Sequence, residues 1–148
     1  MSPDEWRDQL LTASARETPQ QEAEFLRLVD MVAGRLTPQF AKLLLATFSE
    51  GADSRTQERV CNVLAGATAD TRIEAILREL PRLNREARQW ADALMGELVE
   101  HDLLALKRHL HIATPGIRLA VGELLSHPDF CKLHPEAQSL RSYCAASA

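Results

Sequence analysis

The sequence predicts an all-α fold: a short right-handed superhelix of about four stacked helical hairpins (a HEAT/TPR-like α-solenoid), with a compact helical bundle as the alternative. Three observations predict it. Apolar residues recur at helical spacing along most of the chain, helix-start signals repeat, and no segment alternates apolar with polar residues over strand length. With 148 residues, 45% of them apolar, we expect one helical-repeat domain over residues 1–148, with the last few residues frayed.

Helix starts are marked by a hydroxyl residue followed by proline. The hydroxyl can cap free N–H groups, and a proline at the first helical position loses no helix hydrogen bond. The pairs are Ser2-Pro3, Thr18-Pro19, Thr37-Pro38 and Thr114-Pro115. In the first two pairs, Glu5 and Gln21 stand at the capping-box position, from which each side chain can reach back to the N–H of the capping residue.

These caps and the apolar periodicity together predict eight main helices. We expect them over residues 3–14, 19–34, 38–48, 55–66, 70–80, 85–99, 102–112 and 115–126. Beyond His127, two His-Pro pairs predict turns, followed by a short last helix over 135–144.

The stretch RELPRLNREARQWADALMGEL contains a proline between two helical patterns. Pro81 cannot donate to a carbonyl one turn back, so we expect the preceding helix to end near Leu80. Asn84 can then cap a helix that begins at Arg85. The stretch therefore predicts a helical hairpin with its corner at the proline.

The predicted helices also show a period. Hairpins begin near residues 38, 70 and 102, so a helical pair recurs about every 30 to 32 residues, as stacked repeats require. The signature residues of tetratricopeptide units are missing, and armadillo and HEAT units are usually longer. The repeat is one of shape rather than of sequence.

Composition and charge narrow the range of possible functions. The formal charge of −4 comes without a basic block, which disfavours nucleic-acid binding as a main role. No apolar run approaches the roughly 20 residues that cross a bilayer, and no signal segment is recognised, so we expect a cytoplasmic protein without a membrane role. Cys61, Cys131 and Cys144 match no zinc or redox spacing and are predicted to be reduced thiols.

No constellation typical of an enzyme is assembled in the sequence. It contains no nucleophile elbow, and its six glycines are dispersed singly, so none builds a phosphate-binding loop. Glu97 and His101 stand four residues apart on a predicted helix and could share an ion, but a full ligand set is missing. We therefore predict no catalytic residues, no metal and no cofactor.

The polar faces of the second helices of successive hairpins are the candidate partner site. In a stacked array these helices line one continuous concave surface. Glu58 and Asn62 lie on the predicted helix 55–66, and Gln89 and Asp92 on the predicted helix 85–99. The alternative interpretation is an ordinary solvated face held by weak ion pairs.

The order of several features matches a known family. LLLATFSEGAD forms an apolar helix that ends in Phe48, with Glu50 and Asp53 just beyond it. A Leu-Pro turn at Pro81, Trp90 in the next helix and a later LKRHL follow. This part of the chain, about half of it, resembles the all-helical, HEAT-like immunity proteins that bacteria encode beside polymorphic or contact-dependent toxins.

The resemblance implies a cytosolic antidote that binds a cognate toxin domain and blocks its active site or substrate path, without catalysis. Many such toxins are nucleases with basic clefts, so acidic side chains could imitate the phosphates of the substrate. Together with the polar faces described above, this gives the predicted partner-binding residues Glu50, Asp53, Glu58, Asn62, Gln89, Asp92 and Glu97. A helical-repeat scaffold or adaptor that joins two other proteins is the alternative, and the identity of the toxin and the oligomeric state stay open.

Overall fold

The computed structural model describes residues 1–49 and 54–144, and in this part of the chain every regular element is a helix. The predicted all-α class is confirmed. The elements are α1 (Pro3–Ala13), α2 (Pro19–Met31), α3 (Pro38–Leu45), α4 (Ser54–Ala65), α5 (Ala69–Glu86), α6 (Arg88–His101), α7 (Leu103–His111), α8 (Pro115–Leu125), α9 (Pro128–Leu133), the 3₁₀-helix η1 (Pro135–Leu140) and α10 (Arg141–Cys144).

The chain divides into two compact units, Met1–Arg72 and Ile73–Ala148, called here the first and the second unit. The superhelical stacking of hairpins and the single-domain organisation stay predictions. None of the described helices is both long and apolar enough to span a bilayer.

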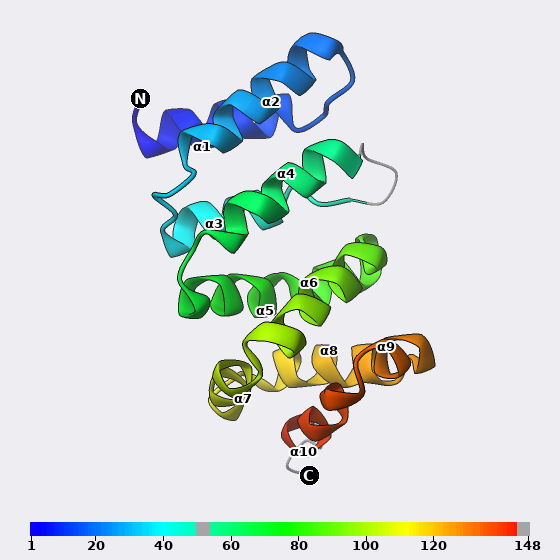
Figure 1. The fold of residues 1–148 in the computed structure, drawn as a ribbon. Helices are drawn as coiled ribbons and strands as arrows, with labels where there is room; N and C mark the ends of the chain where they lie inside the picture. Colours follow the sequence, from blue (N-terminus) through cyan, green and yellow to red (C-terminus); the bar gives the residue numbers. More distant parts are fainter. Residues whose placement is uncertain (50–53, 145–148) are drawn as a thin grey trace. The chain divides into compact units, whose positions relative to one another are not determined.

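In the first unit, α1 and α2 form a hairpin, and α2 and α3 both pack against α4 (Figure 1). The core between them holds fully buried side chains from each helix: Leu10, Phe25, Leu28, Leu44 and Val60. Trp6 is 2% exposed, and its indole Nε1 donates to the carbonyl oxygen of Leu28 at 2.8 Å. That bond satisfies the one polar atom of a buried tryptophan and ties α1 to α2.

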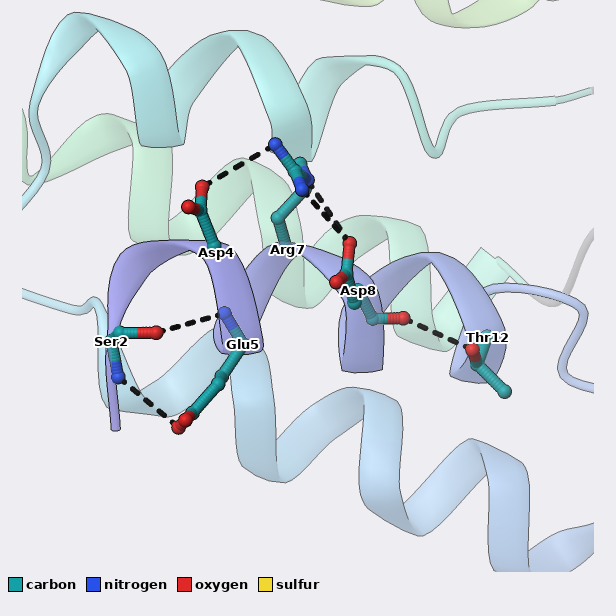
Figure 2. A network of polar contacts seen from close by, with 6 residues as sticks. All are labelled: Ser2, Asp4, Glu5, Arg7, Asp8 and Thr12. Carbon is teal, nitrogen blue, oxygen red and sulfur yellow. Dashed lines mark hydrogen bonds and ion pairs between the residues drawn. The ribbon is translucent and has the colours of Figure 1, made fainter.

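The helix starts predicted at the four hydroxyl-proline pairs are confirmed, as Figure 2 shows for α1. The Oγ of Ser2 accepts from the N–H of Glu5 at 3.1 Å, and a Glu5 carboxylate oxygen accepts from the N–H of Ser2 at 3.3 Å. Thr18 caps α2 in the same way, but Gln21 accepts from the N–H of Glu17 at 2.8 Å, one residue before the predicted partner. The hydroxyls of the remaining two pairs cap α3 and α8.

Arg16 joins the end of α1 to the rest of the first unit. Its backbone has a φ of 52°, in the left-handed region that few non-glycine residues adopt. The guanidinium donates to the hydroxyl of Thr56 at 3.0 Å and to the carbonyl of Thr47 at 2.8 Å, and it stacks on the ring of Phe25 at 4.6 Å. These contacts fix the chain between α1 and α2 against α3 and α4, which compensates for the backbone strain.

In the second unit, α6 packs against α7, and α8 packs against α9 and α10. The buried side chains again come from several helices of the unit, whereas α10 contributes none. Fully buried examples are Leu83, Met95, Leu98, Leu106, Leu110 and Leu124.

The predicted break at Pro81 is wrong, because α5 continues through the proline to Glu86. A proline inside a helix costs about 3 kcal/mol. Burial of Leu77, Leu80 and Leu83, each at most 3% exposed, offsets this, since each buried leucine contributes about 1.5–3 kcal/mol. The chain breaks instead at Ala87, which is fully buried and has φ −150° and ψ 53°.

The predicted cap by Asn84 is also wrong. Asn84 lies inside α5, and its Nδ2 donates to the carbonyl oxygen of Ala120 at 3.0 Å. The side chain therefore links α5 to α8 rather than ending one helix and beginning another. The next helix starts only at Arg88, without a side-chain cap.

The C-terminal part departs from prediction as well. His127-Pro128 begins α9 instead of forming a turn, because a proline at the first helical position loses no hydrogen bond and Phe130, 3% exposed, anchors the helix. The predicted helix over 135–144 consists of η1 followed by α10. Two other helices end earlier than expected, α2 at Met31 and α3 at Leu45.

Candidate functional site

Glu58 and Asn62 are exposed on α4, four residues apart and therefore on one face of the helix. The opposite face holds the buried residues Gln57, Val60 and Leu64. Neither Glu58 nor Asn62 makes a hydrogen bond or ion pair with another described side chain. Both polar groups are thus directed to solvent, as the spacing predicted.

Both arginines of α4 already form ion pairs with carboxylates of α2. Arg55 pairs with Glu22 at 2.8 Å, and Arg59 pairs with Asp30 at 2.7 Å, both on α2. Because these arginines have carboxylates of their own, their charge is compensated by α2 rather than by Glu58. The carboxylate of Glu58 is the uncompensated charge on this face of α4.

In the second unit the three predicted residues on α6 differ from one another. Gln89 is exposed, and its side chain makes no hydrogen bond with a described residue. Asp92 accepts a hydrogen bond from Nε of Arg88 at 3.0 Å, so its charge is largely compensated. Glu97 is exposed, with a carboxylate oxygen 3.5 Å from Nε2 of His101.

Glu50 and Asp53 lie outside the described residues, and the structure tests neither prediction. The structure brings Glu58 together with Asn62, and Gln89 together with Asp92, each pair on one helix. A single concave surface that includes all of them stays a prediction.

Glu97, Glu100 and His101 form the cluster among the described residues whose donor atoms lie close enough to share an ion, within 4.8 Å of one another. The sequence indicated the first and the last of these. Nδ1 of His134, a residue of the link between α9 and η1, lies 3.2 Å from a Glu100 carboxylate oxygen, a contact that spacing along the chain could not reveal. The three clustered side chains are exposed on one helix, where water solvates them, and we assign no ion to them.

An open cleft of about 440 Å³ lies between α1 and α2, lined mostly by polar residues such as Asp8, Thr12 and Gln20. Glu24 at its edge accepts hydrogen bonds from Arg27, and this contact lowers the pKa of Glu24 from its ordinary value. The carboxylate stays ionised near neutral pH, but it faces a cation of its own helix and not a reacting group.

The three cysteines, all within the described residues, form no disulfide. Cys131 and Cys144 donate their thiol hydrogens to the carbonyl oxygens of Leu125 and Leu140, at 3.2 and 3.3 Å. Burial raises the pKa of the Cys144 thiol, and the positive charges of Arg141 and Arg118 act against this rise. Because the thiolate is the nucleophile, a thiol with a raised pKa is a poor candidate for catalysis.

Comparison with known proteins found no matching family model, no similar curated protein and no similar solved structure.

Proposed function

We propose that this protein is an immunity protein that binds a cognate bacterial toxin domain and covers its active site or substrate path. The observation that carries the proposal is the exposed, uncompensated carboxylate of Glu58 beside Asn62 on α4. The resemblance of the sequence to HEAT-like immunity proteins supports it. The proposal requires no catalysis and places the protein in the cytoplasm of the cell that makes the toxin.

The charge pattern supports a basic partner surface. A carboxylate without a cation of its own attracts a basic cleft, and such attraction raises the association rate and helps to orient the partner. The three predicted acidic residues that the structure describes should then contribute unequally to the binding affinity. We expect Glu58 to contribute most, Glu97 less, and Asp92 least, because Arg88 already binds the carboxylate of Asp92.

The first experiment identifies the partner. The tagged chain is expressed in its native host, and proteins that copurify with it are identified by mass spectrometry. One stoichiometric partner that is toxic when expressed alone, and harmless when coexpressed with this chain, supports the proposal. Several harmless partners would instead favour a scaffold or adaptor.

The second experiment tests the role of Glu58. We expect Glu58→Lys to weaken binding of the captured partner by about tenfold or more, about 1.4 kcal/mol, and to reduce the salt dependence of the association rate. Glu17→Lys is the matched control, since Glu17 is exposed in the same unit and its side chain makes no hydrogen bond or ion pair with a described residue. Equal affinities and equal salt dependence for both variants would contradict the charge proposal.

A further inference from the structure

A cleft of about 390 Å³ lies between α7 and α10, two helices of the second unit that pack against each other. Leu104, Lys107, Arg108 and His111 line it from α7, and Tyr143 lines it from α10. The spacing of the four α7 residues places them on one helix face over two turns. One side of the cleft is therefore formed by a single face of α7, and the other side includes the aromatic ring of Tyr143.

The cleft is basic, although the protein as a whole carries a formal charge of −4. Neither residues 103–112 nor residues 141–144 include an aspartate or glutamate. Lys107 and Arg108 make no ion pair or hydrogen bond through their side chains with another described residue. Their positive charges are thus available to a ligand.

Two arginines of α5 in the second unit are paired with carboxylates of their own helix. Arg78 pairs with Glu74 at 2.9 Å, and Arg82 pairs with Glu79 at 2.9 Å. Unlike these two arginines, Lys107 and Arg108 have no carboxylate partner among the described residues, and both line the cleft.

An exposed apolar group accompanies these charges. Leu104 is 78% exposed, and Ile112, directly after α7, is 80% exposed. Single exposed apolar residues are common, but here the leucine lines a cavity beside two free cations and a tyrosine. A ligand that fits this lining combines negative charge with an apolar group.

The cleft is also preformed. Leu106 and Leu110 are fully buried and hold the inner face of α7. Arg118 donates to the carbonyl oxygen of His111 at 2.6 Å, and Arg141 donates to that of Leu125 at 3.1 Å, which ties α10 to the end of α8. A site whose walls are already fixed loses less entropy when a ligand binds.

We propose that the cleft between α7 and α10 binds an acidic peptide segment of a partner protein. One apolar side chain of the segment packs against Leu104 and Tyr143, and neighbouring carboxylates pair with Lys107 and Arg108. The planar guanidinium of Arg108 suits a carboxylate, which it can bind through two parallel hydrogen bonds.

The lining favours a peptide over a polynucleotide. Single-stranded nucleic acid is typically bound along a basic groove by several aromatic side chains that stack with successive bases. Among the described lining residues the rings are those of Tyr143 and His111, on different helices rather than in a row, and the apolar contact is the aliphatic Leu104. This site takes an acidic segment, whereas the carboxylate of Glu58 on α4 favours a basic one, so the inference is independent of the proposed toxin.

The test uses the full chain and short fluorescein-labelled peptides, with binding followed by fluorescence polarisation at low salt. The main probe has the sequence Glu-Asp-Leu-Leu-Asp-Glu, and a second probe replaces both leucines with serine. A labelled oligothymidylate is the third. We expect the leucine probe to bind best and its affinity to fall as salt is raised.

Variants assign the binding to the cleft. Arg108→Glu is expected to weaken binding of the leucine probe by about tenfold or more, because it replaces an attractive charge with a repulsive one. Leu104→Ser should reduce binding of the leucine probe and leave that of the serine probe unchanged. Lys132→Glu is the matched control, since Lys132 is an exposed cation on α9 whose side chain makes no hydrogen bond or ion pair with a described residue.

The proposal is overturned if the leucine probe does not bind, if the serine probe binds equally well, or if Lys132→Glu weakens binding as much as Arg108→Glu. Tighter binding of the oligothymidylate would also overturn it and indicate a nucleic-acid site. Circular dichroism of each variant confirms that the helices are intact. The peptide assay needs no toxin, so its outcome is separate from that of the proposed immunity function.

Discussion

The first and second units differ in how their helices begin. In the first unit, α1, α2 and α3 each start with a serine or threonine whose hydroxyl accepts a backbone N–H, followed by a proline. In the second unit, α6 starts after Ala87 and α7 after Asp102, and neither residue provides a side-chain cap. Among the described helices that begin in the second unit, α8, with Thr114, alone has the type of start seen in the first unit.

The difference shows two ways of setting a helix boundary. A cap acts over three residues and needs nothing else from the protein. Where no cap is present, the boundary depends on side chains that are buried against other helices. The path of α5 through Pro81 is the clearest case, because the proline disfavours a continuous helix and the burial of the leucines around it favours one. Four substitutions test this comparison.

The largest effect is expected at Leu83, which is fully buried two residues after the proline. Leu83→Ala should lower the free energy of unfolding by about 2–5 kcal/mol, through lost burial and the cavity left behind. Urea denaturation followed by circular dichroism measures the change. Leu119→Ala, at a residue 64% exposed on α8, is the control and should change stability by less than about 0.5 kcal/mol. Similar losses in both variants would show that burial does not hold α5 together.

Pro81→Ala should raise the free energy of unfolding by about 2 kcal/mol. The substitution removes a helix-interior cost of about 3 kcal/mol, and the greater freedom of the unfolded chain takes back about 1 kcal/mol. The same denaturation experiment measures it. A loss of stability would mean that the proline is required where it stands, and would contradict the interpretation that packing overrides it.

Gly96→Ala tests a contact between distant parts of the second unit. A Cβ at residue 96 would lie 2.5 Å from Nε2 of His134, whose side chain is 15% exposed and packs against Phe130. We expect a loss of about 1–2 kcal/mol from the displaced ring. In a His134→Ala background the same change should instead raise stability by up to about 1 kcal/mol, because alanine is the better helix former. A loss of equal size in both backgrounds would exclude the ring as the cause.

Thr37→Ala removes a cap from the first unit and should lower the free energy of unfolding by about 1 kcal/mol. The threonine hydroxyl accepts from the N–H of Phe40 at 3.2 Å. Thr37→Ser keeps the hydroxyl and is the control, with a change expected within a few tenths of a kcal/mol. Thermal unfolding of the three proteins compares them, and an alanine variant as stable as the serine variant would argue against local control of this start.

The candidate surfaces also combine features that nearby residues determine with features that tertiary contacts determine. The exposure of Glu58 and Asn62 could be predicted, because a helix with buried residues at Val60 and Leu64 must turn those positions outward. Which charges remain free could not be predicted. Arg59 pairs with Asp30, 29 residues away, and among the described residues no carboxylate pairs with Lys107 or Arg108.

The sequence by itself determined the all-helical class and the helix starts at hydroxyl-proline pairs, because periodicity and capping act between residues a few positions apart. The tertiary structure alone decided that α5 runs through Pro81, that Asn84 bonds to Ala120 instead of capping a helix, and that Leu104 and Tyr143 share a cleft. Each of these three features depends on a partner more than thirty residues away or on burial by other helices. Neighbouring residues in the sequence reveal neither the distant partner nor the burial.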